Sequence, residues 1–169
     1  LRKVRKEFQI VFQDPLASLD PRMSIGASIA EPLQTFRHDL NRAARQEMVR
    51  TMMSRVGLDP NMINRYPHEL SGGQNQRVGI ARAMILDPKL VICDEAVSAL
   101  DVSIQAQIIE LLLKLQQELG LSMIFISHDL SVVREISHRV MVLYLGRVVE
   151  EADREQIYED ARHPYTRAL

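Results

Sequence analysis

Apolar residues in the second half of the chain fall into short continuous runs that alternate with amphipathic stretches. Residues 89–93 and 122–126 are nearly all apolar, which is typical of parallel strands covered on both faces. Between them, apolar side chains recur at steps of three and four over residues 102–119, and this spacing predicts a helix that Gly120 ends. The alternation of strands and helices predicts an α/β fold with a mainly parallel sheet.

The first half of the chain is mostly helical in its pattern. Residues 8–12 predict one short strand, and prolines at positions 15 and 21 predict a loop after it, because proline disfavours helical geometry in the residue before it. Gly57 suits the left-handed position that closes the second of three helical stretches. We expect an all-helical insert over about residues 25–87. The three helical stretches cover residues 25–36, 40–56 and 75–86.

The remaining residues complete the expected organisation. Residues 130–136 predict a helix, residues 140–150 a hairpin around Gly146, and residues 153–158 a last short helix. We place the rest of the α/β core at about residues 88–150 and the start of a C-terminal extension at about 151–169.

Composition narrows the class of protein. The 169 residues are 46% hydrophobic, enough for one domain with a core, and the net charge of −1 gives no general attraction to nucleic acid. Cys93 lies in an apolar run, so we expect a buried structural thiol and a reducing, cytosolic compartment. The apolar stretches are far shorter than the roughly 20 residues that a membrane-spanning helix needs. A local basic cluster is expected to be the solvated start of a strand: Arg2, Lys3, Arg5 and Lys6.

Two adjacent glycines stand at the entry of the helix predicted over residues 75–86. The first N–H groups of a helix have no partner inside it, and the helix dipole adds partial positive charge there. The stretch could therefore hold a phosphate group; it consists of Ser71, Gly72, Gly73 and Gln74. The alternative is an ordinary helix start that Ser71 caps without a ligand.

An acidic pair follows the predicted strand at residues 89–93. Ligands of open α/β sheets bind at the carboxyl ends of strands. Asp94 could hold Mg²⁺ directly or through water, because Mg²⁺ prefers oxygen ligands. Glu95, one residue further on, should point the other way and could orient or deprotonate an attacking water. The alternative is a plain pair of acids at a strand end.

Three further polar residues stand where elements end or begin. His128 follows the strand at residues 122–126 and could contact a phosphate oxygen or a water, or belong to a turn in which Asp129 caps the next helix. Gln13 follows the first predicted strand, and taken alone it says little. Asp101 precedes the helix at residues 102–119 and suits an N-cap, a role compatible with a second function.

Taken in order, these motifs resemble those of the ATP-binding-cassette ATPases. Residues 70–74 resemble the family signature, residues 90–95 its Walker B strand, and residues 98–101 its D-loop. Gln13 resembles the Q-loop glutamine, and His128 the switch histidine. The resemblance covers essentially the whole chain and implies a P-loop NTPase-like sheet with an all-α signature subdomain.

The resemblance implies a role for each residue near ATP and Mg²⁺. Asp94 would position Mg²⁺ and Glu95 would be the catalytic base. His128 would contact the γ-phosphate and the attacking water. Gln13 would sense Mg²⁺ and water and link the site to a transmembrane partner.

The signature motif would act across a dimer. In a head-to-tail pair, the signature motif of one subunit would contact the γ-phosphate of ATP held by the other subunit. Asp101 would lie across that interface. The residues that would contact this ATP are Ser71, Gly72, Gly73 and Gln74.

A subfamily is also suggested. Residues 11–15, 18–23, 97–104 and 163–166 resemble those of the importer ATPases for oligopeptides, dipeptides, glutathione and nickel. This resemblance implies the energy-coupling ATPase subunit of a bacterial importer. It would lie peripherally on the cytoplasmic face of the inner membrane. Its partners would be permease subunits and, indirectly, a substrate-binding protein, and it would not bind nucleic acid.

Two departures from the family pattern change the expectation. Ala96 stands where the family usually has proline, which should loosen the turn slightly. The sequence contains no Gly-x-x-x-x-Gly-Lys-Ser/Thr stretch, which is the Walker A loop of such ATPases. We therefore expect the C-terminal part of an ATPase, truncated at its N-terminal side and cut at both ends. We expect this part to be inactive alone. The alternatives are a soluble ATPase of the same superfamily that acts on nucleic acid or ribosomes, and a non-catalytic fragment that binds a partner.

Overall fold

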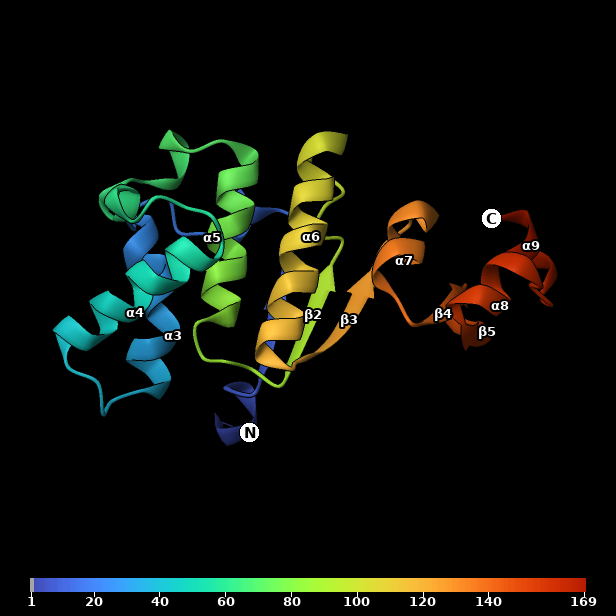
Figure 1. Cartoon of the computed structure of the whole chain (residues 1–169), viewed down its shortest axis with the longest axis horizontal. Coiled ribbons are helices and arrows are strands. Elements are labelled where there is room, and N and C mark those ends of the chain that lie inside the picture. The colour runs from blue at the N-terminus through green and yellow to red at the C-terminus, as the bar shows by residue number, and fades with distance from the viewer. Residues whose placement is uncertain (1) are drawn as a thin grey trace. The chain divides into compact units, whose positions relative to one another are not determined.

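A computed structural model of the chain describes residues 2–169, with side chains from Val4 onward (Figure 1). The chain forms two compact units, the first ending at Ile126 and the second spanning Ser127–Leu169. Within residues 2–169, no helix combines the length and the apolar character needed to cross a bilayer.

The first unit contains a three-stranded parallel sheet. Its strands are β1 (Phe8–Val11), β2 (Leu90–Asp94) and β3 (Ser122–Ile126). They lie in the order β1-β2-β3, with Phe8 opposite Leu90 and Leu90 opposite Ser122. The predicted α/β fold with parallel strands is therefore confirmed, and the pairing of β1 with β2 joins segments that lie far apart in sequence.

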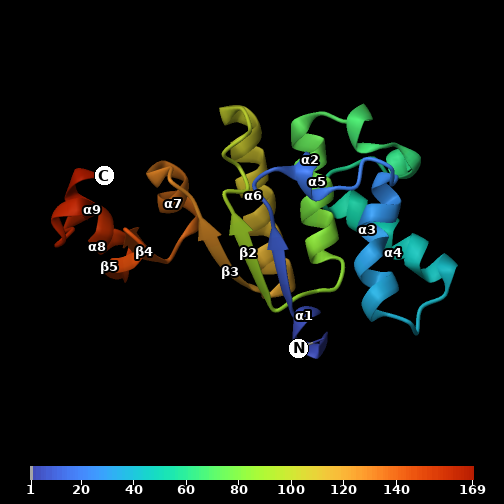
Figure 2. The ribbon, with the colours of Figure 1, turned by 180° about the vertical axis from the view of Figure 1, so that it is seen from behind.

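Helices α5 (Gly72–Met84) and α6 (Val102–Leu119) cover one face of this sheet (Figure 1), and Figure 2 shows the opposite face in front of them. Cys93 is buried as predicted, and burial raises the pKa of its thiol to about 12. On the opposite face, Ile124 is 48% exposed and Ile126 is 46% exposed. The prediction that both faces of these strands are covered is wrong for the described residues, because the two helices pack on one side alone.

The helical insert lies before α5 in sequence and packs against it. Ile29, Met53 and Met84, one from each of its long helices and α5, are fully buried. Asn41 accepts a hydrogen bond from the Ala44 N–H, so the second helix begins two residues later than predicted. The elements are α3 (Ile25–Phe36), α4 (Arg42–Arg55) and two 3₁₀ turns, η1 (Pro60–Asn64) and η2 (Pro67–Glu69). The predicted left-handed Gly57 follows α4, with φ of 75°.

Two short helices lie where the sequence predicted a loop and the start of a strand. The predicted loop after β1 contains α2 (Pro15–Ser18), because the Asp14 carboxylate accepts the N–H groups of Leu16 and Ala17 and proline suits the first helical turn. The basic cluster near the N-terminus lies around α1 (Arg2–Arg5), not in the start of a strand. The strand itself begins at Phe8.

The second unit is built around a hairpin. The turn between its strands has positive φ at both Leu145 and Gly146, as in the tight turns that match strand twist. A small core of Val140, Val142 and Ile157 holds the hairpin against the helices. The elements are α7 (Leu130–Ile136), β4 (Arg139–Tyr144), β5 (Arg147–Asp153), α8 (Arg154–Glu159) and α9 (Pro164–Ala168).

The last helix, α9, has no counterpart in the sequence prediction. The His163 Nδ1 accepts the Tyr165 N–H, and proline follows at the first helical position. The Glu150 carboxylate accepts the backbone N–H groups of Arg162 and His163 at 2.7 and 3.0 Å. A contact from β5 therefore stabilises the turn that starts α9.

Candidate functional site

Gln13 and Glu95 meet at the carboxyl ends of β1 and β2. The Gln13 Nε2 donates to the Glu95 Oε2 at 2.6 Å and to the Ser98 Oγ at 3.2 Å. Because parallel strands end at the same edge of a sheet, the pairing of β1 with β2 places the two residues side by side. The structure thus brings together two residues that the sequence nominated from separate motifs.

The backbone of Glu95 leaves the strand abruptly. Its φ is +45°, a conformation that costs a non-glycine residue about 1–3 kcal/mol, which the surrounding contacts must offset. Its N–H donates to the Ile126 carbonyl at 3.0 Å, and its own carbonyl accepts the Ser98 N–H and hydroxyl. Strand alternation therefore does not set the direction of the Glu95 side chain, and the expectation that it points opposite Asp94 stays a prediction.

The turn after Glu95 is anchored in the core. Ala96 is 1% exposed and Val97 is 3% exposed, so two buried side chains follow the strained residue. The loosening expected from alanine in place of proline at this position stays a prediction.

Asp94 ends β2 and is exposed, with Ile126 opposite it in the neighbouring strand. No group of three or more potential metal-ligating His, Cys, Asp or Glu side chains occurs within residues 2–169. A carboxylate from Asp94 and a carbonyl oxygen from Gln13 are the donors that Mg²⁺ accepts when water and phosphate oxygens complete its shell. The chemistry of these two candidate donors is compatible with Mg²⁺ bound together with a nucleotide.

The start of α5 is capped by its own residues. The Ser71 Oγ accepts the Gln74 N–H at 3.3 Å, and the Gln74 Oε1 accepts the Ser71 N–H at 3.0 Å. This capping box accounts for α5 beginning at Gly72, three residues before the predicted start. Ser71 therefore caps the helix as expected, and whether the same turn also binds a phosphate stays a prediction. Among the described residues, the N–H groups of Gly72 and Gly73 have no hydrogen-bond acceptor and can therefore face an anion.

Gly73 has a packing role that the sequence did not reveal. A Cβ at this position would lie 2.7 Å from the Ile104 Cγ2 of α6. At Gly72 a Cβ would only reach ordinary contact, 3.8 Å from the Leu100 Cδ2. Gly73 therefore allows α5 to approach α6 closely, whatever its N–H binds.

Residues 98–101 form a turn that ends at α6. Asp101 is exposed and occupies the N-cap position, yet its side chain makes no capping hydrogen bond. The Gln105 Nε2 instead donates to the carbonyls of Val97 and Leu100, both at 3.0 Å. The sequence analysis did not identify Gln105. The only feature in the sequence that points to it is a polar side chain one turn into α6, from which it can fold back on the loop.

Arg82 connects the signature helix to the segment after Gln13. Its Nη1 donates to the Ser18 carbonyl at 2.6 Å, at the end of α2. Burial lowers the pKa of Arg82, and the Glu31 carboxylate opposes that shift. Sequence reasoning missed this residue as well, although an arginine between the buried Ala81 and Ala83 is an unusual placement.

His128 belongs to the second unit, where Asp129 and Ser127 make the turn around it. The Asp129 carboxylate accepts the N–H groups of Ser131 and Val132, and the Ser127 Oγ accepts the Asp129 N–H at 3.0 Å. Capping of α7 thus falls to Asp129, as the structural alternative proposed, and does not require the imidazole.

The chain is similar in sequence to a protein family and to ATP-binding proteins of known transporters. The family model described as ABC transporter matches residues 1–98. The oligopeptide transport ATP-binding protein OppF of Escherichia coli (strain K12) is 62% identical over 168 residues, which are 99% of this chain and 50% of that protein. The glutathione import ATP-binding protein GsiA of Pectobacterium atrosepticum is 56% identical over 170 residues, covering 100% of this chain and 27% of that protein.

Solved structures agree in fold. A dimeric post-hydrolysis state of the ATP-binding cassette MJ0796, bound to ADP and Pi, has a TM-score of 0.78 and 31% identity, covering 89% of this chain and 65% of that chain. The cbiO1 component of the cbiONQ transporter complex of Clostridium perfringens has a TM-score of 0.81 and 29% identity, covering 94% and 61%. The chain spans about half the length of the OppF proteins that it matches. These matches and the motif order together show that the chain belongs to the ABC transporter family, among its ATP-binding subunits.

Proposed function

We propose that the whole protein is the ATP-hydrolysing, energy-coupling subunit of a bacterial peptide-type importer. The contact of Gln13 with Glu95 carries the proposal, because it assembles an amide and a carboxylate at the sheet edge where ligands of α/β folds bind. The 62% identity to an oligopeptide transport ATP-binding protein supports a peptide-type substrate.

In this proposal Glu95 is the catalytic base. Its carboxylate takes a proton from the attacking water, and the Gln13 amide keeps that carboxylate in one orientation. Asp94 and Gln13 would hold Mg²⁺, which, when bound, neutralises charge on the phosphate oxygens of ATP. His128 would contact the γ-phosphate and the attacking water.

The signature residues would serve a second ATPase subunit. The Gly72 and Gly73 N–H groups at the start of α5 are suited to the γ-phosphate of ATP held by that subunit, with Ser71 and Gln74 shaping the turn. Asp101 has no capping role to fulfil and would lie across the same head-to-tail interface. ATP binding would then join the two subunits.

The roles of the relatives in oligopeptide transport and glutathione import support a wider assembly at a membrane. Transmembrane permease subunits would be direct partners and a substrate-binding protein an indirect one. The protein would lie on the cytoplasmic face of the bacterial inner membrane. The 169 residues by themselves would not hydrolyse ATP, because they contain no Gly-x-x-x-x-Gly-Lys-Ser/Thr loop.

Affinity purification of the full-length protein from its native membrane tests the proposal. We expect co-purification of permease subunits and a second ATPase, with ATP hydrolysis that a peptide-loaded binding protein stimulates. Recovery of ribosomes or nucleic acid in place of membrane subunits would contradict the importer assignment and favour a soluble ATPase of the same superfamily. Permease binding without any hydrolysis by the full-length protein would favour a non-catalytic partner-binding role.

A further inference from the structure

We propose that α8 braces α7, the helix that begins two residues after His128, and that Tyr158 and Arg154 are positioning residues for this histidine. The proposal rests on the proposed role of His128 and adds a part of the chain that no motif nominated. It assigns a function to the first helix of the expected C-terminal extension.

Helix α7 is too short to hold its own position. It has seven residues, whereas isolated helices shorter than about 12–15 residues are marginal in water. Its start is capped by Asp129, the residue directly after His128. The position of the first turn of α7 therefore sets the position of the His128 backbone.

Tyr158 of α8 fixes that first turn. Its hydroxyl donates to the carbonyl of Leu130, the first residue of α7. The Arg134 guanidinium carbon lies 5.4 Å from the centre of the Tyr158 ring, within the range of a cation–π interaction. Burial raises the pKa of the Tyr158 phenol above its ordinary value, which already leaves the hydroxyl protonated at neutral pH.

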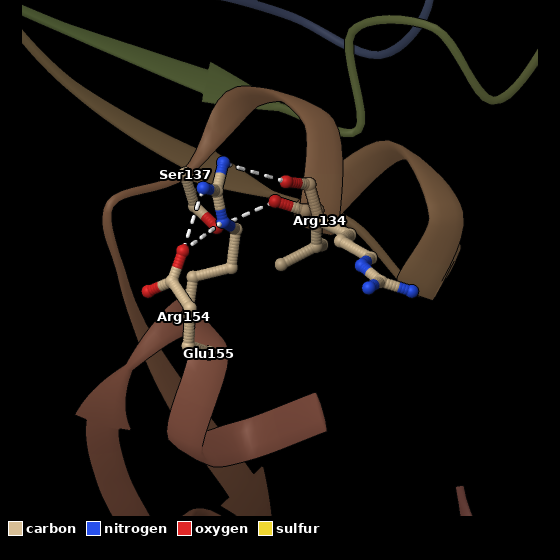
Figure 3. A network of polar contacts seen from close by, with 5 residues as sticks. Arg134, Ser137, Arg154 and Glu155 are labelled. Atoms are coloured by element: carbon tan, nitrogen blue, oxygen red, sulfur yellow. Dashed lines mark hydrogen bonds and ion pairs between the residues drawn. The ribbon is translucent and has the colours of Figure 1, made fainter. Parts of the chain in front are cut away.

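Arg154 holds the opposite end of α7. Figure 3 shows its guanidinium between the Arg134 carbonyl and the Glu155 carboxylate. The Nη1 donates to that carbonyl at 3.3 Å, and the Nη2 donates to the Glu155 Oε1 at 2.7 Å. The backbone N–H of Arg154 also donates to the His138 carbonyl at 3.0 Å. A cation at the carbonyl end of a helix is favoured by the helix dipole.

An apolar contact joins the two polar ones. Val133 of α7 packs against the cluster that contains Ile157 of α8. Helix α7 is thus held at its first turn by Tyr158, at its last turn by Arg154, and between them by packing. A shift of α8 along α7 would displace the turn that carries His128.

The test uses the full-length protein with ¹³C-labelled histidine, and a His128→Asn variant assigns the His128 signal. We expect Tyr158→Phe to shift this signal and to lower kcat about twofold to tenfold, with the KM for ATP unchanged, because only the hydroxyl is removed. Tyr165→Phe is the matched control in the same unit, and it should leave the signal and kcat unchanged. Arg154→Met should act like Tyr158→Phe, and Arg154→Lys, which keeps a donor, should restore part of the loss.

Each alternative outcome has a distinct meaning. A wild-type His128 signal and kcat in both Tyr158→Phe and Arg154→Met would overturn the brace. A lower unfolding temperature with an unchanged His128 signal would also overturn it, because the contacts would then be merely structural. Undiminished hydrolysis in His128→Ala would instead contradict the proposed role of His128, and the His128 signal would still decide whether α8 positions it.

Discussion

The Gln13 amide donates to the Glu95 carboxylate at 2.6 Å across 82 positions of sequence. A hydrogen bond to an ionised acceptor is stronger than one between neutral groups. Ser98 closes the arrangement, because its hydroxyl accepts from Gln13 and donates to the Glu95 carbonyl. The Gln13 amide therefore bonds both to the Glu95 carboxylate and to the loop that follows Glu95.

Replacement of Glu95 by glutamine separates chemistry from assembly. The amide oxygen of Glu95→Gln can still accept the Gln13 hydrogen bond, but it cannot take a proton from water. We expect the full-length variant to lose ATP hydrolysis and to retain ATP-dependent dimers in size-exclusion chromatography. Glu110→Gln, at an exposed position of α6, should hydrolyse ATP normally. Dimers lost together with activity would show that Glu95 is a structural residue.

Alanine at Gly73 should disrupt the packing of the signature helix. Its Cβ would lie 2.7 Å from the Ile104 Cγ2, and overpacking of this kind costs about 1–3 kcal/mol in the free energy of unfolding. Urea unfolding of the full-length protein would measure the loss. Leucine has no Cγ2, so Gly73→Ala with Ile104→Leu should recover much of it.

A second glycine in the same helix supplies the control. A Cβ at Gly79 meets nothing within 4 Å, so Gly79→Ala should be neutral or stabilising by up to about 1 kcal/mol. Equal destabilisation by Gly73→Ala and Gly79→Ala would rule out the contact with Ile104 as the cause.

Gln105 should contribute to dimer formation through residues 98–101. In Gln105→Leu the carbonyls of Val97 and Leu100 lose their shared donor, a change worth about 1 kcal/mol or more. Combined with Glu95→Gln, it should weaken ATP-dependent dimerisation about threefold to tenfold in sedimentation experiments. Gln117→Leu, at an exposed position of α6, should not change the dimer constant. Identical constants for the two leucine variants would contradict a role for Gln105.

Acid should weaken the second unit through Glu150. Hydrogen bonds from the Arg162 and His163 backbone N–H groups hold the pKa of this carboxyl below its ordinary value of 4.5. Because the folded-state pKa is the lower one, the stabilisation is complete above about pH 4.5 and is lost as pH falls through the folded-state pKa. Glu150→Gln should flatten the fall in unfolding temperature on the acid side, whereas Glu159→Gln should follow the wild type. Parallel curves for all three proteins would disprove the linkage.

The 169 residues by themselves should neither hydrolyse ATP nor remain monomeric. They contain no Gly-x-x-x-x-Gly-Lys-Ser/Thr loop, and one sheet face leaves Ile124 and Ile126 about half exposed. Light scattering should reveal self-association, and phosphate release should equal the background. Turnover that disappears in Glu95→Gln, or a monodisperse monomer with a sharp unfolding transition, would refute this expectation.

Local signals in the sequence determined most of the elements. The prediction matched the bounds of α6, β3 and α7, because apolar spacing, Gly120 and the Asp129 cap act within a few residues of each boundary. The family motifs likewise nominated Gln13, Asp94 and Glu95. The prediction failed at α2, where a proline that begins a helix resembles one that marks a loop, and it did not include α9, which also begins with a proline.

Tertiary structure alone decided how the nominated residues act. Pairing of β1 with β2 brings Gln13 to Glu95, and the left-handed backbone of Glu95 depends on hydrogen bonds from Ser98 and to Ile126. Gly73 is required by Ile104, a residue on another helix. These contacts join positions far apart in the chain, and only the folded chain brings such positions within the few ångströms at which hydrogen bonds and steric contacts act.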